Sequence, residues 1–153
     1  MSDRQLAPTD EVAVETVRAA LRGHRLRCTG ERVQVMLTLT AAGGHLSAAD
    51  IHQRIVAGGH RLNLSTVYRT VTLLHGLGIV HALALPDQPV SYGIVEQPHH
   101  HAVCTCCQSV TEVPAAVLSD AVDLVQQATG YRLEQSSLQL NGLCARCRAL
   151  ASS

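Results

Sequence analysis

A chain of 153 residues can bury a sizeable core as one domain or as two small ones. It has no Phe, no Trp and no Lys, so its core has to be built from Leu, Val, Ile and Ala. Twelve arginines balance twelve acidic side chains, but residues 16–69 hold eight arginines against two acids. This local excess suits a polyanion such as DNA, and solvated surface arginines are the alternative.

The segment of the first nine residues is short and polar, and no apolar run approaches the roughly 20 residues needed to cross a bilayer. The sequence therefore predicts a cytoplasmic protein. Its six cysteines then do not predict a disulfide framework, because cytosolic thiols are kept reduced. Metal binding is the first alternative.

Four short helices are predicted in the first half from apolar spacing and glycine stop signals, over residues 11–21, 31–40, 48–56 and 65–75. Thr29 and Ser47 are the expected N-caps of the second and third helices, and Ser65 begins the fourth. The buried stripe of the third helix is expected to comprise Ala48, Ile51, Ile55 and Val56.

The third and fourth helices are separated by a short glycine-containing connection, which is typical of a helix-turn-helix. Residues 79–85 form an apolar β-prone run, residues 86–89 a turn and residues 90–95 a returning strand, as in a wing. We therefore expect a winged-helix DNA-binding domain over residues 1–84, and a hinge with the end of the wing over residues 85–98.

Residues 99–153 are predicted to form a small α/β domain for metal binding and dimerisation. A strand at 109–113 leads to a helix opened by Pro114 and stopped by Gly130, and a last strand covers 131–140. The helix is expected to bury Val117, Leu118, Ala121, Leu124, Val125 and Ala128. This half has too little core to be confidently stable alone, so a bound metal or dimerisation should support it. The fold class is therefore α/β (α+β), a winged helix followed by this domain.

Two Cys-x-x-Cys pairs, Cys104 with Cys107 and Cys144 with Cys147, have the spacing at which a turn aims two thiolates at one ion. Four thiolates make a closed tetrahedral zinc site, so we expect a structural zinc ion. A redox dithiol and disulfides are the alternatives. The remaining thiols, Cys28 and Cys106, are expected to be incidental, although Cys106 could replace Cys107 and either of the two could serve redox chemistry.

His99, His100 and His101 precede the first cysteine pair on a predicted strand. Alternate residues on a strand share a face, so His99 and His101 can bind one ion while His100 points away. Solvated surface histidines are the alternative.

Nearly the whole chain, from about Val14 to Cys147, resembles the ferric uptake regulator (Fur) family. Residues 64–70, Leu-Ser-Thr-Val-Tyr-Arg-Thr, are similar to its recognition-helix motif, and residues 99–104 followed by Cys107 are similar to its metal signature. The resemblance implies that His45 reaches a sensing metal from the DNA-binding domain and that Glu112 matches an acidic ligand.

Two departures from the family pattern bear on the metal. Gly93 follows Tyr92 where iron- and peroxide-sensing members carry an acidic ligand, which favours zinc or nickel over iron or manganese. His81 lies close to a ligand position of zinc-sensing members. The expected sensing site is therefore His81, His99 and His101, completed by Glu112 or His45, with zinc favoured and Fe²⁺, Ni²⁺ or Mn²⁺ as alternatives. An accessory site looks lost, because Ser119 and Ser136 stand at two of its positions.

The resemblance further implies a homodimer that represses transcription at a palindromic operator, with metal as corepressor and ligands drawn from both domains. The DNA contacts expected from it involve Ser65, Thr66, Tyr68, Arg69, Arg27 and Arg32. An iron-, nickel- or peroxide-responsive regulator is the alternative within the family. A zinc-dependent hydrolase is the alternative outside it, and the sequence lacks a recognisable nucleophile or acid–base pair for that role.

Overall fold

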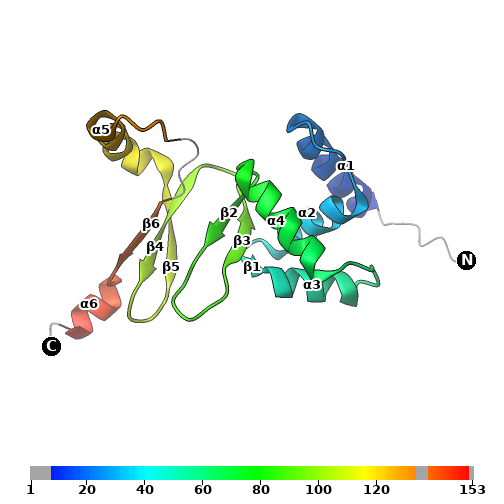
Figure 1. Ribbon diagram of the computed structural model, residues 1–153. Coiled ribbons are helices and arrows are strands. Elements are labelled where there is room, and N and C mark those ends of the chain that lie inside the picture. Colours follow the sequence, from blue (N-terminus) through cyan, green and yellow to red (C-terminus); the bar gives the residue numbers. More distant parts are fainter. Residues whose placement is uncertain (1–7, 134–137, 152–153) are drawn as a thin grey trace, which may run out of the picture. The chain divides into compact units, whose positions relative to one another are not determined.

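The computed structural model describes residues 8–133 and 138–151 (Figure 1). They divide into two compact units, one running to Ala84 and including Pro89–Ile94, the other comprising Leu85–Gln88 and the chain from Val95 onward. No helix among the described residues has both the length and the apolar character to cross a membrane.

The N-terminal unit contains four helices and a three-stranded sheet. Its helices are α1 (Pro8–Gly23), α2 (Gly30–Ala42), α3 (Ala48–Ala57) and α4 (Leu64–Gly76), and its strands are β1 (Leu46–Ser47), β2 (Val80–Leu83) and β3 (Ser91–Ile94). The four helices are where the sequence predicts them, and β2 and β3 form the predicted wing. The two-residue strand β1 was not predicted.

Two of the helix starts follow the expected capping chemistry. The Thr29 side chain accepts a hydrogen bond from the backbone N–H of Arg32 at the start of α2. Ser47 and Asp50 form a reciprocal capping box on α3. α4 begins at Leu64, one residue before the expected Ser65, and its N-cap residue Asn63 makes no side-chain cap.

The core of the N-terminal unit lies where α1 to α4 meet one face of the sheet. Among its fully buried side chains are Leu21, Val35, Ile51, Val67, Val71 and Leu74. Val56 was expected in this core but is 48% exposed, because it follows Ile55 directly and so lies on the neighbouring, outward side of α3. The strand order is β1-β3-β2, and both pairings are antiparallel.

The C-terminal unit contains a second three-stranded sheet, with helical segments between its second and third strands and after its last strand. Its elements are β4 (His99–Cys104), β5 (Val110–Pro114), a 3-10 turn η1 (Ala115–Leu118), α5 (Ser119–Thr129), β6 (Gln139–Gly142) and α6 (Ala145–Ala151). β4 is central, antiparallel to β5 and parallel to β6. Gly130 ends α5 in the left-handed conformation at φ 73°, as its position predicts.

Two expectations about this unit are wrong. The predicted apolar stripe of the helix after Pro114 buries no residue, and Val117, Leu124 and Val125 are 66%, 64% and 48% exposed, because none of the residues that the structure describes covers that face. The last strand begins at Gln139, whereas residues 131–133 are not in a strand and residues 134–137, with Ser136, lie outside the described part. The helix α6 was not predicted.

Candidate metal centres and nucleic-acid interface

The four cysteines of the two Cys-x-x-Cys pairs lie together in the C-terminal unit. Cys104 ends β4 and Cys107 lies in the turn before β5, while Cys144 and Cys147 flank the start of α6. Their four Sγ atoms are within 4.8 Å of one another. The Sγ atoms of Cys107 and Cys144 are 3.8 Å apart, which is roughly the separation of two thiolates on one tetrahedral zinc with Zn–S bonds of about 2.3 Å.

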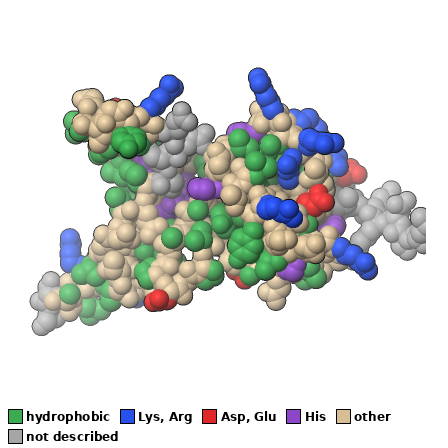
Figure 2. Space-filling view, in the orientation of Figure 1, with side chains coloured by type: hydrophobic (Ala, Val, Ile, Leu, Met, Phe, Trp, Pro, Cys, Tyr) green, Lys and Arg blue, Asp and Glu red, His purple; other side chains and the backbone are tan. Residues whose placement is uncertain are grey.

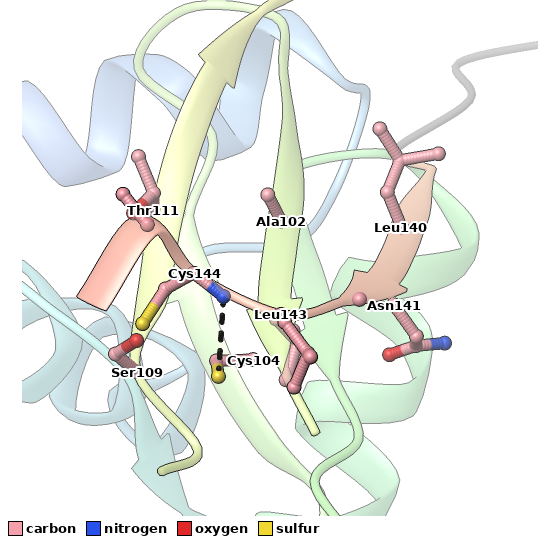
Figure 3. Close-up of a pocket in the computed structure, with 11 residues that line it drawn as sticks. Ala102, Cys104, Ser109, Thr111, Leu140, Asn141, Leu143 and Cys144 are labelled. Atoms are coloured by element: carbon pink, nitrogen blue, oxygen red, sulfur yellow. Dashed lines mark hydrogen bonds between the residues drawn. The ribbon is translucent and has the colours of Figure 1, made fainter. Parts of the chain in front are cut away.

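Backbone N–H groups donate hydrogen bonds to the sulfur atoms of this cluster and so stabilise thiolates. The N–H of Cys144 donates to Cys104 Sγ at 3.4 Å (Figure 3), and the N–H of Cys147 donates to Cys144 Sγ at 3.4 Å. Hydrogen bonds from the backbone of Cys107 and Cys144 lower the pKa of the Cys104 thiol to about 6. Such bonds favour the charged form that a metal requires.

The pKa values of two other thiols in the cluster are shifted in opposite directions. The Ser109 hydroxyl, 3.2 Å from Cys107 Sγ, lowers the pKa of that thiol. The pKa of Cys147 is raised, chiefly by its hydrogen bond to Cys144, because a thiol held between thiolates keeps its proton. A metal ion bound by all four sulfurs has to displace that proton.

A hydrogen bond with Cys107 and the negative charge of the cluster raise the pKa of the Arg146 guanidinium. Arg146 and Ser109 are thus partners of the cluster that sequence reasoning missed. Arg146 lies between the second pair of cysteines, so its position was the available signal.

A hollow of about 380 Å³ lies beside the cluster, lined by residues of β4, β5, β6 and the loop after β6 (Figure 3). Cys104 and Cys144 are in its wall, together with apolar residues such as Leu140 and Leu143. It holds no acid–base pair or nucleophile with a base, so it offers no catalytic constellation.

Cys28 and Cys106, the two thiols outside the cluster, are both exposed. The Cys106 thiol is nevertheless close enough to contribute to the raised pKa of Cys147. The structure brings together Cys107, and not Cys106, with the other three sulfurs.

The expected alternation along β4 is confirmed. The rings of His99 and His101 lie on one face with centroids 4.8 Å apart, in an edge-to-face arrangement. Glu112 is the register partner of His101 on β5, and its Oε1 is 3.9 Å from Nε2 of His99. The side chains of His99, His101 and Glu112 therefore lie close together in this unit.

His100 has a different role. Its side chain is 3% exposed, and its Nδ1 accepts a hydrogen bond from the backbone N–H of Leu138 at 3.1 Å. This contact joins β4 to the segment that enters β6, so His100 is fixed by the fold rather than offered to solvent.

The other two histidines of the expected sensing site, His45 and His81, meet in the N-terminal unit. Their ring centroids are 4.6 Å apart, and their Nε2 atoms face each other within hydrogen-bonding distance. Nε2 is a usual metal-binding atom of neutral imidazole. Within each unit the structure thus brings part of the expected sensing site together, His45 with His81 in one, and His99 with His101 and Glu112 in the other.

The helix expected to enter DNA is exposed along one side. Tyr68 is 48% exposed, and Ser65 and Arg69 are exposed as well, while Val67 and Val71 of the same helix are fully buried. Figure 2 shows arginine side chains gathered over the helices of this unit. An outward face with Tyr and Arg suits the major groove, where Tyr can contact a thymine methyl.

The two other arginines expected at DNA differ in their surroundings. Arg27 is exposed. The guanidinium of Arg32 donates to the backbone carbonyl of Arg27 at 2.9 Å, so this side chain holds the loop between α1 and α2. Thr66 is half-buried, and its backbone N–H bonds to the carbonyl of Asn63.

Comparison with known proteins agrees with this arrangement. The sequence model of the Ferric uptake regulator family matches residues 23–141. A ferric uptake regulation protein of Neisseria meningitidis is 30% identical over 133 residues, which cover 86% of this chain and 92% of that protein. A peroxide-responsive repressor of Staphylococcus saprophyticus is 24% identical over 140 residues, covering 92% of this chain and 95% of that one.

Solved structures share the fold. The ferric uptake regulator of Pseudomonas aeruginosa with manganese has a TM-score of 0.68 at 24% identity and covers 84% of this chain and 98% of that one. A zinc uptake regulator complexed with zinc and DNA has a TM-score of 0.65 at 23% identity and covers 97% and 100%. Relatives with different metal responses are thus similarly distant, so these similarities do not assign the metal.

Proposed function

The chain belongs to the ferric uptake regulator family of metal-responsive transcription regulators, which are not enzymes, and from that premise we propose that it is a zinc-responsive repressor. It acts in the cytoplasm as a homodimer at a palindromic operator. One zinc ion in the four-cysteine cluster maintains the fold, and a second ion held by histidines regulates DNA binding.

The observation that carries the choice of zinc is the ligand chemistry around Gly93. The side chains that meet beside this residue are the imidazoles of His45 and His81, and an oxygen ligand is missing at the position itself. Imidazole suits zinc or nickel, whereas iron(II) and manganese(II) sites draw more on carboxylate oxygen. In the C-terminal unit, the Glu112 carboxylate lies 3.9 Å from Nε2 of His99.

The proposed role of the dimer rests on the exposed apolar face of the C-terminal unit. Val117, Leu124 and Val125 are each about half exposed or more, although their spacing is that of a buried helix stripe. A second copy of the chain that covers this face would bring two winged helices to the two halves of a palindrome.

Regulation requires that the ion favour the DNA-binding arrangement. Shifting a population from 1:99 to 99:1 takes roughly 5.5 kcal/mol of differential binding. Several imidazole ligands that converge only in one arrangement can supply that difference. We propose that the protein without the regulatory ion stays folded on its structural zinc and binds DNA weakly.

Zinc is expected to activate operator binding at a lower free concentration than iron(II) or manganese(II), with nickel as the nearest competitor. The experiment is a titration of operator binding by fluorescence anisotropy in metal-buffered solutions, anaerobic for iron. Protein with only its structural zinc provides the baseline. Iron(II) as the most effective activator would assign the chain to the iron-responsive or peroxide-responsive alternative.

Tyr68→Ala and Arg69→Ala are each expected to weaken operator binding by about 1–3 kcal/mol without changing zinc content or dimer mass. Tyr68→Ala should reduce sequence discrimination more, whereas Arg69→Ala should reduce the salt dependence, if Arg69 binds phosphate. Tyr131→Ala and Arg132→Ala, exposed in the other unit, are matched controls. Unchanged affinity in both helix variants would mean that α4 does not read the operator.

A further inference from the structure

We propose that Gly93 is a positioning residue for the regulatory metal site, because its missing side chain is what allows His45 and His81 to converge. This inference rests on the proposed function, since it assumes that these histidines hold the regulatory ion. Under this proposal, Gly93 does more than lack a carboxylate ligand. Its small size is itself required for metal binding.

The sheet register places the three residues side by side. His81 on β2 is the direct partner of Gly93 on the central strand β3. On the other side Leu46 pairs with Tyr92, so His45, which precedes Leu46, lies next to Gly93. Gly93 on the central strand is therefore flanked by His81 on β2 and by His45, which immediately precedes β1.

The pleat of the sheet puts all three on the same face. Tyr92 and Ile94, the neighbours of Gly93, pack against the helical core of the unit, and so do Leu46 and Val80, the neighbours of the two histidines. Because successive side chains alternate between faces, Gly93 and both imidazoles belong to the face turned away from that core.

A side chain at this position would enter the space that the imidazoles fill. A Cβ built on Gly93 would be 3.1 Å from both Cε1 and Nε2 of His81, and 3.2 Å from Cδ2 of His45. These distances are shorter than ordinary van der Waals contact, so even a methyl group would require the two rings to move by a few tenths of an ångström. A carboxylate side chain would need more room still, so it and the imidazole pair compete for the same volume.

Glycine is not needed here for its backbone freedom. Gly93 is not among the glycines with positive φ, so alanine can adopt its backbone conformation. The cost of a substitution therefore comes from the two rings alone.

The arrangement of the rings explains why small displacements should affect metal binding. Two neutral imidazoles can bring their Nε2 atoms together if one donates N–H to the lone pair of the other, or if both direct lone pairs at a shared cation. The second state needs both rings close and aimed at one point. A methyl group between them works against that geometry.

The experiment combines zinc affinity with a stability cycle. Chelator competition measures zinc binding at the regulatory site of protein whose four-cysteine cluster is loaded, for wild type, Gly93→Ala and the matched control Gly76→Ala. Gly76 has no neighbour near its would-be Cβ and no positive φ. Gly93→Ala is expected to weaken regulatory zinc binding by roughly tenfold, and Gly76→Ala to leave it unchanged.

For the stability cycle, the melting temperature Tm of each variant is measured without regulatory metal. Gly93→Ala should lower Tm in the wild-type background but not in the His45→Ala/His81→Ala background, where the added methyl group has room. An equal loss of Tm in both backgrounds, or wild-type zinc affinity in Gly93→Ala, would overturn the role of Gly93. If the double histidine variant itself keeps regulatory zinc binding, the proposed ligands are wrong, and this inference fails with them.

Discussion

Replacing Cys104 or Cys147 by serine is expected to remove the metal from the four-cysteine cluster and to unfold much of the C-terminal unit. A serine hydroxyl stays protonated near neutral pH, so one thiolate ligand is lost in each variant. Both cysteines are buried. Zinc content should fall by about one ion per chain, and the dimer should dissociate.

The expected effect is large because this unit has little else to hold it together. Among its described residues, the buried apolar side chains are Val103 and the two cysteines themselves, and α5 buries none. Binding of a structural zinc provides on the order of 10 kcal/mol, and that binding energy becomes folding energy when the site does not exist in the unfolded chain.

Circular dichroism, metal analysis and light scattering on the same preparations measure these effects. Cys28→Ser is the matched control, because this exposed thiol belongs to the N-terminal unit. Cys106→Ser tests the neighbouring thiol and should also retain zinc. A Cys104→Ser protein that keeps its zinc and its dimer mass would show that the cluster does not stabilise the fold.

The helices of the N-terminal unit could be predicted because their signals are local. Thr29 and Ser47 cap the helices they were expected to cap, and Ala48, Ile51 and Ile55 of the third helix are buried as expected. The start of α4 could not be resolved, because Asn63 and Ser65 are both suitable capping residues. The two-residue strand β1 depends on pairing with β3, which lies more than forty residues further along the chain.

The helix after Pro114 shows the opposite case. Its apolar spacing predicts burial, and the structure leaves Leu124 and Val125 exposed. Periodicity reports that a face is apolar but does not say which molecule covers it. The apolar face that was expected to be buried and is exposed therefore supports the proposal that a second copy of the chain covers it.

The site was predictable where spacing along the chain determines geometry. The two cysteine pairs converge, and His99 and His101 share a face of β4 as alternation requires. The close approach of His45 to His81 could not be obtained this way, because it depends on the register of three strands. Gly93 was readable as a missing acidic ligand, but its steric role needed the positions of both rings.

His99→Ala combined with His101→Ala is expected to abolish the metal response while leaving the protein folded. The substitutions remove two imidazoles that share one face of β4, and they leave His100, which bonds to the backbone of Leu138, in place. The four sulfurs of the other cluster are untouched. The variant should therefore remain a dimer with about one zinc per chain.

The histidine variant should stay folded and the cysteine variants should not, because the two metal sites have different roles. Thiolates in a closed cluster contribute to folding, whereas histidines that bind a regulatory ion contribute to the difference between two folded states. Loss of the regulatory ligands should leave operator affinity at the weak level of the protein without regulatory metal. Added zinc should then produce no increase, where the wild type gains at least tenfold.

Operator binding measured with and without added zinc, on preparations whose zinc content and mass are known, tests this expectation. His52→Ala combined with His60→Ala is a control that removes two histidines from the N-terminal unit outside the proposed site. His45→Ala combined with His81→Ala should behave like the β4 variant if, as the sequence predicts, both groups of histidines serve one ion. A normal zinc response in the His99→Ala/His101→Ala protein would show that these histidines do not bind the regulatory metal, and the sensing role would have to be assigned to other residues.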